Sequence, residues 1–197
     1  MKEDSCGGEF LFCFITNNFS IAQKAEKAGV GRIGPDLEIL GKEARQKHYD
    51  ARISRHTVED VKSIRRILTN AEVFVRINPI HSNSKYEIDN VIDAGAQSIM
   101  LPMFRTAFEV SNFVSMVRER AKAIILLETP EAMMRIDEIL SVGGIREIHF
   151  GLKICILVSN FTRVLKCFVQ NSWMLLLRPR KNEVFHMASE PLVGPMT

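Results

Sequence analysis

Arg76 is a charged residue within an otherwise apolar segment, VFVRINP at residues 73–79. A guanidinium held in such a segment can bind a carboxylate through two hydrogen bonds and can stabilise an oxyanion as negative charge develops. A buried ion pair with Glu38 or Glu128 explains the same charge equally well. The segment alone therefore leaves a catalytic and a structural role for Arg76 open.

Glu128 ends a second apolar segment, IILLE at residues 124–128, and Pro130 then predicts the first position of a helix. A carboxylate at the end of a buried strand is a hard oxygen ligand of the kind that Mg²⁺ and Mn²⁺ prefer. A favourable charge at the helix N-terminus is the alternative role, but Glu131 already fills it. We therefore interpret Glu128 as a candidate metal ligand.

Other polar residues give weaker indications. Asp36 and Glu38 flank a leucine at the end of another apolar segment. An ordinary polar loop would have the same composition, so these two acids alone do not indicate a site. His56 precedes a helix that Thr57 caps, and we expect it to be a solvent-facing loop histidine. Three further histidines, His48, His81 and His149, do not have the spacing of metal ligands.

Short apolar segments and helical segments alternate along the chain, and they must position these residues. The pattern predicts strands at 10–16, 32–38, 72–78, 98–102, 121–129 and 147–152, and helices at 20–28, 58–68, 86–94, 108–118 and 130–140. Such alternation predicts an α/β fold with parallel strands covered by helices. Polar residues that follow several successive strands favour an incomplete (β/α)8 TIM barrel of about six βα units over an open sheet. No glycine-rich dinucleotide or phosphate-binding motif is present.

The composition is that of an ordinary soluble chain. The 197 residues suggest one domain, and the net charge of +3 includes no basic stripe, so we expect no nucleic-acid partner. No apolar run approaches the ~20 residues of a membrane span, and no secretory signal is recognisable. Four cysteines at irregular spacing favour a reducing compartment, so we expect a cytoplasmic protein without membrane partners.

Five short strings, in order, resemble the HpcH/HpaI aldolase and citrate lyase family over residues 10–152. They are Asp36-Leu37-Glu38, Val75-Arg76-Ile77-Asn78, Met100-Leu101-Pro102-Met103, Leu127-Glu128-Thr129-Pro130-Glu131-Ala132 and Gly151-Leu152. The resemblance implies a phosphoenolpyruvate-type (β/α)8 barrel that makes or breaks a carbon–carbon bond next to a 2-oxo acid or acyl-CoA. It also implies a homo-oligomer for the intact family.

The resemblance implies a role for each candidate. A divalent cation, Mg²⁺ or Mn²⁺, would be held by Glu128 and by an Asp after the sixth strand, and would chelate a pyruvate-like unit. Arg76 would stabilise the enolate oxygen, and Glu38 and Asp36 would help to bind the substrate. One branch of the family has a His as its base directly after the acid at 38, and here that position is Ile39. The identity of the base and the substrate therefore stay open.

The sequence departs from the family pattern just past Leu152, where the expected Asp is absent and the chain continues Lys153-Ile154-Cys155. The composition changes at the same place: residues 151–197 hold six Lys and Arg but only two acids. A frameshift explains both observations, because residues 180–191 read in another frame resemble the seventh strand of the family. We therefore expect a partial barrel at 1–152 and an irregular or locally helical, non-family tail at 153–197.

Loss of the second metal ligand predicts a metal-dependent carbon–carbon lyase with impaired activity. The alternative is a non-catalytic remnant that binds a small carboxylate or a partner chain. In both cases the first and sixth strands would be open edges, which favour association and poor solubility.

Overall fold

The computed structural model describes residues 11–42, 54–151 and 184–188, the last of these as backbone only. The strands are β1 (Cys13–Ile15), β2 (Arg32–Gly34), β3 (Glu72–Arg76), β4 (Ser98–Leu101), β5 (Lys122–Leu127), β6 (Glu147–Gly151) and β7 (Val184–Ala188). The helices are α1 (Phe19–Lys27), α3 (Val58–Ile67), α4 (Ser84–Asp93), α5 (Ala107–Val117), α6 (Pro130–Met134) and α7 (Ile136–Leu140). None of these helices is long and apolar enough to cross a membrane.

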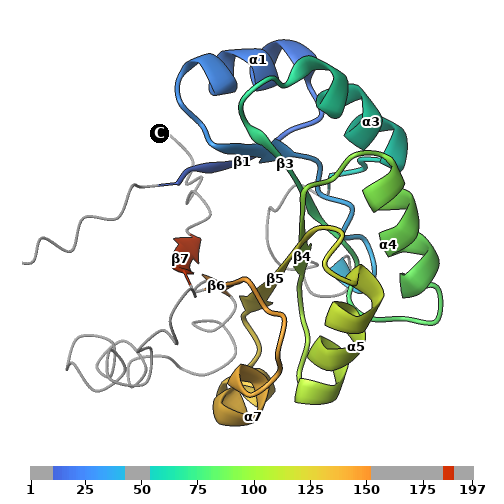
Figure 1. Cartoon of the computed structure of the whole chain (residues 1–197), viewed down its shortest axis with the longest axis vertical. Helices are drawn as coiled ribbons and strands as arrows, with labels where there is room; N and C mark the ends of the chain where they lie inside the picture. Colours follow the sequence, from blue (N-terminus) through green and yellow to red (C-terminus); the bar gives the residue numbers. More distant parts are fainter. Residues whose placement is uncertain (1–10, 43–53, 152–183, 189–197) are drawn as a thin grey trace, which may run out of the picture.

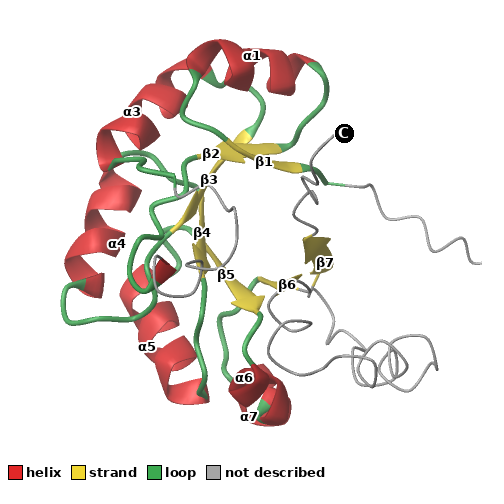
Figure 2. Ribbon diagram, turned by 180° about the vertical axis from the view of Figure 1, so that it is seen from behind, coloured by secondary structure: helices red, strands yellow, loops and turns green. Residues whose placement is uncertain are grey.

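The strands form one parallel sheet in the order β1-β2-β3-β4-β5-β6-β7, so every strand pairs with the next one along the chain. The sheet curls, and the helices lie on its convex side (Figures 1 and 2). This arrangement is the first part of a (β/α)8 barrel and confirms the predicted fold class.

Alternate residues of each strand pack on opposite faces of the sheet. Val73, Val75 and Ile99 belong to the large apolar core that includes the helices. Phe74 and Met100, which alternate with them, belong to a smaller cluster with Ile124 and Leu126 on the concave side. Because both faces are buried, the strands read as continuous apolar segments rather than as alternating ones.

Capping residues and glycines mark several helix ends, and the predicted cap at Thr57 is confirmed. Thr57 caps α3 and Thr106 caps α5, each with a reciprocal capping box that the third helical residue completes. Gly29 and Gly95 follow α1 and α4 with φ of 89° and 100°, backbone angles that residues with a Cβ rarely adopt. These turns return the chain to the sheet within a few residues.

Most of the predicted strands extend past the observed ones, and two differences have a clear local cause. β2 ends at Gly34 instead of continuing to residue 38, because Pro35 has no N–H to donate to a neighbouring strand. Asp36 still forms an isolated bridge with Arg76. The predicted helix at 130–140 is divided into α6 and α7 at Arg135. The Arg135 N–H donates to the carbonyl of Ala132, three residues earlier, which is the spacing of a 3₁₀ turn.

The tail differs from the prediction in its five described residues. β7 pairs in parallel with β6 along its whole length, from Glu147 with Val184 to Gly151 with Ala188. The irregular structure expected past residue 153 is therefore wrong for this segment, where backbone pairing satisfies the exposed edge of β6. β6 is not an open edge, and the edge strands of the described sheet are β1 and β7. The division at residue 152 stays a prediction, because 152–183 and 189–197 lie outside the described residues.

Candidate functional site

Asp36 and Arg76 form an ion pair where β2 and β3 end. Arg76 Nε lies 2.9 Å from Asp36 Oδ1, and Arg76 Nη2 lies 2.8 Å from Asp36 Oδ2. Glu38 Oε2 is a more distant partner, at 3.4 Å from Arg76 Nε. The backbone joins the same segments, because the Leu37 N–H donates to the Arg76 carbonyl at 2.8 Å. The main ion-pair partner of Arg76 is thus Asp36, whereas the sequence suggested Glu38 or Glu128 for that role.

Lys42 is a second cation at this site. Its Nζ lies 2.6 Å from Asp36 Oδ2 and 3.9 Å from Glu38 Oε2, and the residue is only 4% exposed. Burial by itself would raise the pKa of Asp36, but the hydrogen bonds and charges of Arg76 and Lys42 outweigh it and lower that pKa to about 2. Asp36 is therefore a carboxylate at any physiological pH. The sequence offered no signal for Lys42 beyond its place four residues after Glu38.

Arg76 stays charged for the matching reason. Burial works against its cationic form, but the hydrogen bonds that it donates to Asp36 and the charges of Asp36, Glu38 and Glu128 raise its pKa above the usual value. Glu128 directly follows β5 and Arg76 ends β3, so both lie at the C-terminal end of the same parallel sheet. The sequence-predicted residues Asp36, Glu38, Arg76 and Glu128 are thus brought together.

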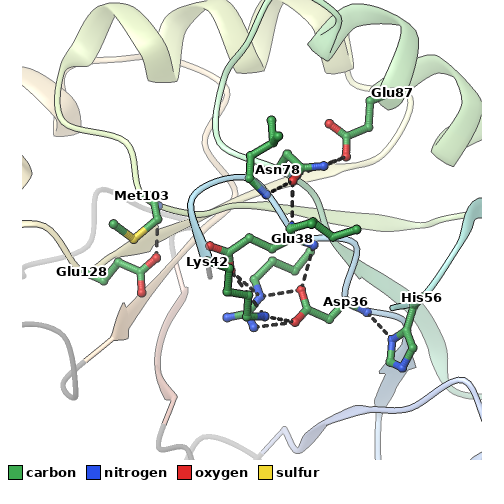
Figure 3. Close-up of polar contacts among 11 residues, drawn as sticks. Asp36, Glu38, Lys42, His56, Asn78, Glu87, Met103 and Glu128 are labelled. Atoms are coloured by element: carbon green, nitrogen blue, oxygen red, sulfur yellow. Dashed lines mark hydrogen bonds and ion pairs between the residues drawn. The ribbon is translucent and has the colours of Figure 1, made fainter. Parts of the chain in front are cut away.

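Asn78 fixes the loop that carries Glu38. Its side-chain oxygen accepts the N–H groups of Ile39 and Leu40 at 2.8 and 2.9 Å, and its amide nitrogen donates to Glu87 Oε1 at 2.8 Å. Figure 3 shows Asn78 between this loop and Glu87. Ile39, at the position where one branch of the family has its base, is 44% exposed and supplies no titratable group.

The histidines differ in their surroundings. His56 is partly buried, and its Nδ1 accepts the Asp36 N–H at 3.0 Å, so the expectation of a solvent-facing side chain is wrong. His81 Nε2 lies 3.0 Å from Glu87 Oε2, and its Nδ1 accepts the Asn83 N–H. His149 is buried, and its Nε2 lies 3.4 Å from Glu147 Oε2. His48 lies outside the described residues.

Glu128 follows β5 and is 5% exposed. Its Oε1 accepts the N–H of Met103 at 3.1 Å, and Met103 itself has a φ of 56° (Figure 3). A Cβ added to Gly151 would lie 2.6 Å from the Glu128 Cβ and 3.0 Å from Oε2. Met103 therefore fixes the Glu128 carboxylate by a hydrogen bond, and Gly151 leaves the space that the Glu128 side chain occupies.

The site offers a divalent cation the right type of ligand, a carboxylate oxygen, but the described residues supply too few of them. Glu128 is a hard oxygen ligand, yet the described residues contain no group of three or more His, Cys, Asp or Glu that could hold a metal ion. The position directly after Leu152 lies outside the described residues. The five charged side chains of the site are Asp36, Glu38, Glu128, Arg76 and Lys42, and they leave one negative charge in excess.

The fold is shared with several solved structures. An HpcH/HpaI aldolase from Desulfitobacterium hafniense matches 90% of this chain and 76% of its own length, with a TM-score of 0.63 and 16% identity. The citrate synthase SbnG matches 91% and 77%, with a TM-score of 0.66 and 16% identity. A phosphonopyruvate hydrolase in complex with oxalate and Mg²⁺ matches 90% and 66%, with a TM-score of 0.59 and 19% identity.

No curated protein matches the sequence significantly. The HpcH/HpaI aldolase/citrate lyase family, in contrast, matches residues 19–153, which is more than half of the chain and includes β2 to β6 with their loops. The match covers all four of the site residues predicted from the sequence. The chain therefore belongs to the HpcH/HpaI aldolase/citrate lyase family.

Proposed function

We propose that this chain is a carbon–carbon lyase of the aldolase type, acting on a 2-oxo acid or an acyl-CoA. The observation that carries the proposal is the fixed guanidinium of Arg76, which donates two hydrogen bonds to Asp36 at the C-terminal end of β3. The C-terminal ends of barrel strands are where such folds place their active sites. Membership of a family of aldolases and lyases supports the general chemistry.

Arg76 is the proposed electrophilic residue. When the carbon–carbon bond breaks, the electron pair of that bond moves onto the 2-oxo unit, and its carbonyl oxygen becomes an enolate oxygen. A buried guanidinium stabilises this oxygen without having to reorganise, because Asp36 and the loop after β2 already fix its position. Glu38 and Asp36 line the same place and contribute to substrate binding.

Glu128 is the proposed ligand of Mg²⁺ or Mn²⁺. A bound divalent ion would polarise the carbonyl of the substrate. The excess negative charge of the site supports this role, because an anionic 2-oxo acid would be repelled unless a further cation were present. Mg²⁺ commonly takes one or two protein carboxylates together with substrate oxygens, so Glu128 alone would bind it weakly. We therefore propose that the activity of this chain is impaired.

A non-catalytic remnant is the second candidate, and one observation favours it. The two hydrogen bonds that Arg76 donates to Asp36 are also what a purely structural ion pair would provide, so Arg76 need not contact a substrate. Such a chain would bind a small carboxylate, or would associate with a partner chain through the edge strand β1.

One assay separates the two candidates. The purified chain is incubated with a 4-hydroxy-2-oxo acid and Mg²⁺ or Mn²⁺, and the released 2-oxo acid is measured with and without a chelator. Metal-dependent cleavage that Arg76→Ala and Glu128→Ala both abolish, while Lys62→Ala on the exposed side of α3 leaves it unchanged, supports the lyase. Absence of turnover in this chain, with turnover after the reading frame past codon 152 is restored, supports the remnant.

A further inference from the structure

We propose that His56 is a positioning residue that fixes Asp36 and, through it, the guanidinium of Arg76. The contact between His56 and Asp36 stands by itself, and its consequence for turnover rests on the proposed lyase function. His56 lies in the connection between β2 and α3, the same connection that carries Asp36 and Glu38, and it comes close to Asp36 from the α3 end of that connection.

The hydrogen bond defines which nitrogen of the imidazole is protonated. The Asp36 N–H donates to His56 Nδ1 at 3.0 Å, so Nδ1 presents a lone pair and the ring proton is on Nε2. The ring position is itself anchored. Thr57 directly follows His56 and caps α3 through a capping box with Asp60, in which Thr57 N lies 2.7 Å from Asp60 Oδ2.

Asp36 needs this acceptor because β2 has already ended. Gly34 is the last residue of β2, and Pro35 has no N–H, so the Asp36 backbone continues the sheet as an isolated bridge to β3. The residue is 2% exposed, and a buried N–H without an acceptor is costly. His56 satisfies this donor from the side opposite to Lys42, as Figure 3 shows.

The carboxylate of Asp36 depends on the same backbone. Its Oδ1 accepts the N–H of Glu38 at 3.1 Å and the Nε of Arg76 at 2.9 Å, and its Oδ2 accepts from Lys42. Rotation of the Asp36 backbone would change all of these directions together. His56 therefore acts on Arg76 through Asp36 and does not itself touch the reacting atoms.

The test compares three variants of the full chain. His56→Leu keeps much of the ring volume but removes the acceptor, whereas His56→Asn places an amide oxygen near the position of Nδ1. Arg55→Ala is the matched control, because Arg55 is the exposed neighbour of His56 in the same loop. Two resonances are followed in ¹⁵N-labelled protein at neutral pH, the backbone amide of Asp36 and the Nε–Hε group of Arg76.

We expect His56→Leu to shift both resonances, and His56→Asn and Arg55→Ala to leave both close to their wild-type positions. Where turnover is measurable, kcat should fall about tenfold in His56→Leu, the effect of about one hydrogen bond, and should recover in His56→Asn, with KM changing less. Unshifted resonances in His56→Leu, or a His56→Asn spectrum like that of His56→Leu, would overturn the proposal. Absence of turnover in every chain would count against the lyase function alone, since the resonances still decide the role of His56.

Discussion

Arg32 and Glu147 form a buried ion pair across the concave side of the sheet, although three strands separate β2 from β6. Arg32 Nη1 and Nη2 each lie 2.5 Å from an oxygen of Glu147, and Arg32 is 2% exposed. Burial disfavours the cation, but the hydrogen bonds and charge of Glu147, with the charge of Glu72, raise the pKa of Arg32. Only a curled sheet brings the first residues of these two strands together, so the pair links opposite walls of the partial barrel.

Removing one partner of this pair should strongly destabilise the fold. Glu147→Gln removes the nearer of the two counter-charges of buried Arg32 and leaves only Glu72, whose Oε2 lies 3.3 Å from Arg32 Nε. We expect a loss of about 3–5 kcal/mol in the free energy of unfolding, measured in urea. The double variant Arg32→Met with Glu147→Leu should recover most of this loss, since apolar side chains replace both members of the pair and Glu72 keeps Lys122 as a partner. Lys62→Ala, which breaks an exposed pair with Glu59, should cost less than about 1 kcal/mol. Equal losses for Glu147→Gln and Lys62→Ala would contradict a cross-barrel role.

Asp36 should make the stability depend on pH in the acid range. Its pKa is about 2 in the folded chain, against an ordinary value of 3.8. Because the folded pKa is the lower one, the stabilising contribution is complete above pH 4 and is lost as the pH falls towards 2. The shift corresponds to about 2 kcal/mol.

Urea unfolding at pH 5 and at pH 2.5 measures this contribution. Asp36→Asn should lower the stability at pH 5 and flatten the pH dependence between the two values. Asp137→Asn, at an exposed aspartate of α7, should leave that dependence as in the wild type. If both variants keep the wild-type pH dependence, Asp36 does not have the ion pairs described above.

The elements that position the site could be predicted from the sequence, because their signals are local. Apolar runs identify β3 to β6, and glycines or capping residues mark where helices begin and end. The boundary of β2 was missed, although Pro35 was a visible reason for an early end. β7 was missed because its pairing depends on the exposed edge of β6, far away in the sequence.

The site itself could be predicted only in part. Arg76 and Glu128 are visible because each is a charge at the end of an apolar segment. Lys42 and His56 lie in the connection between β2 and α3, where a charged or imidazole side chain is ordinary, and only the path of the chain brings them to Asp36. The same limit applies to the pair of Arg32 and Glu147, which are 115 residues apart.

Gly151 should be required for the position of Glu128. In Gly151→Ala the new Cβ would lie 2.6 Å from the Glu128 Cβ, so the glutamate must move away from the N–H of Met103. We expect a loss of about 1–3 kcal/mol in the free energy of unfolding, as for other overpacked sites. Gly143→Ala is the matched control, because a Cβ there has nothing within 4 Å, and its effect should stay within about 0.5 kcal/mol. A Gly151→Ala protein as stable as the control would show that Glu128 is placed differently.

The reading frame past Leu152 should decide the metal affinity of the site. We predict that the gene has lost one base within codons 151–155, and that restoring it supplies an aspartate shortly after Leu152. A second carboxylate beside Glu128 should tighten Mn²⁺ binding about tenfold or more, because carboxylate count sets the affinity of oxygen-ligand sites. Calorimetric titration of Mn²⁺ into the present and restored chains measures the difference, and Glu128→Ala in the restored chain should remove the gain. An uninterrupted gene with no aldolase-like sequence in any shifted frame would rule out this explanation for the missing ligand.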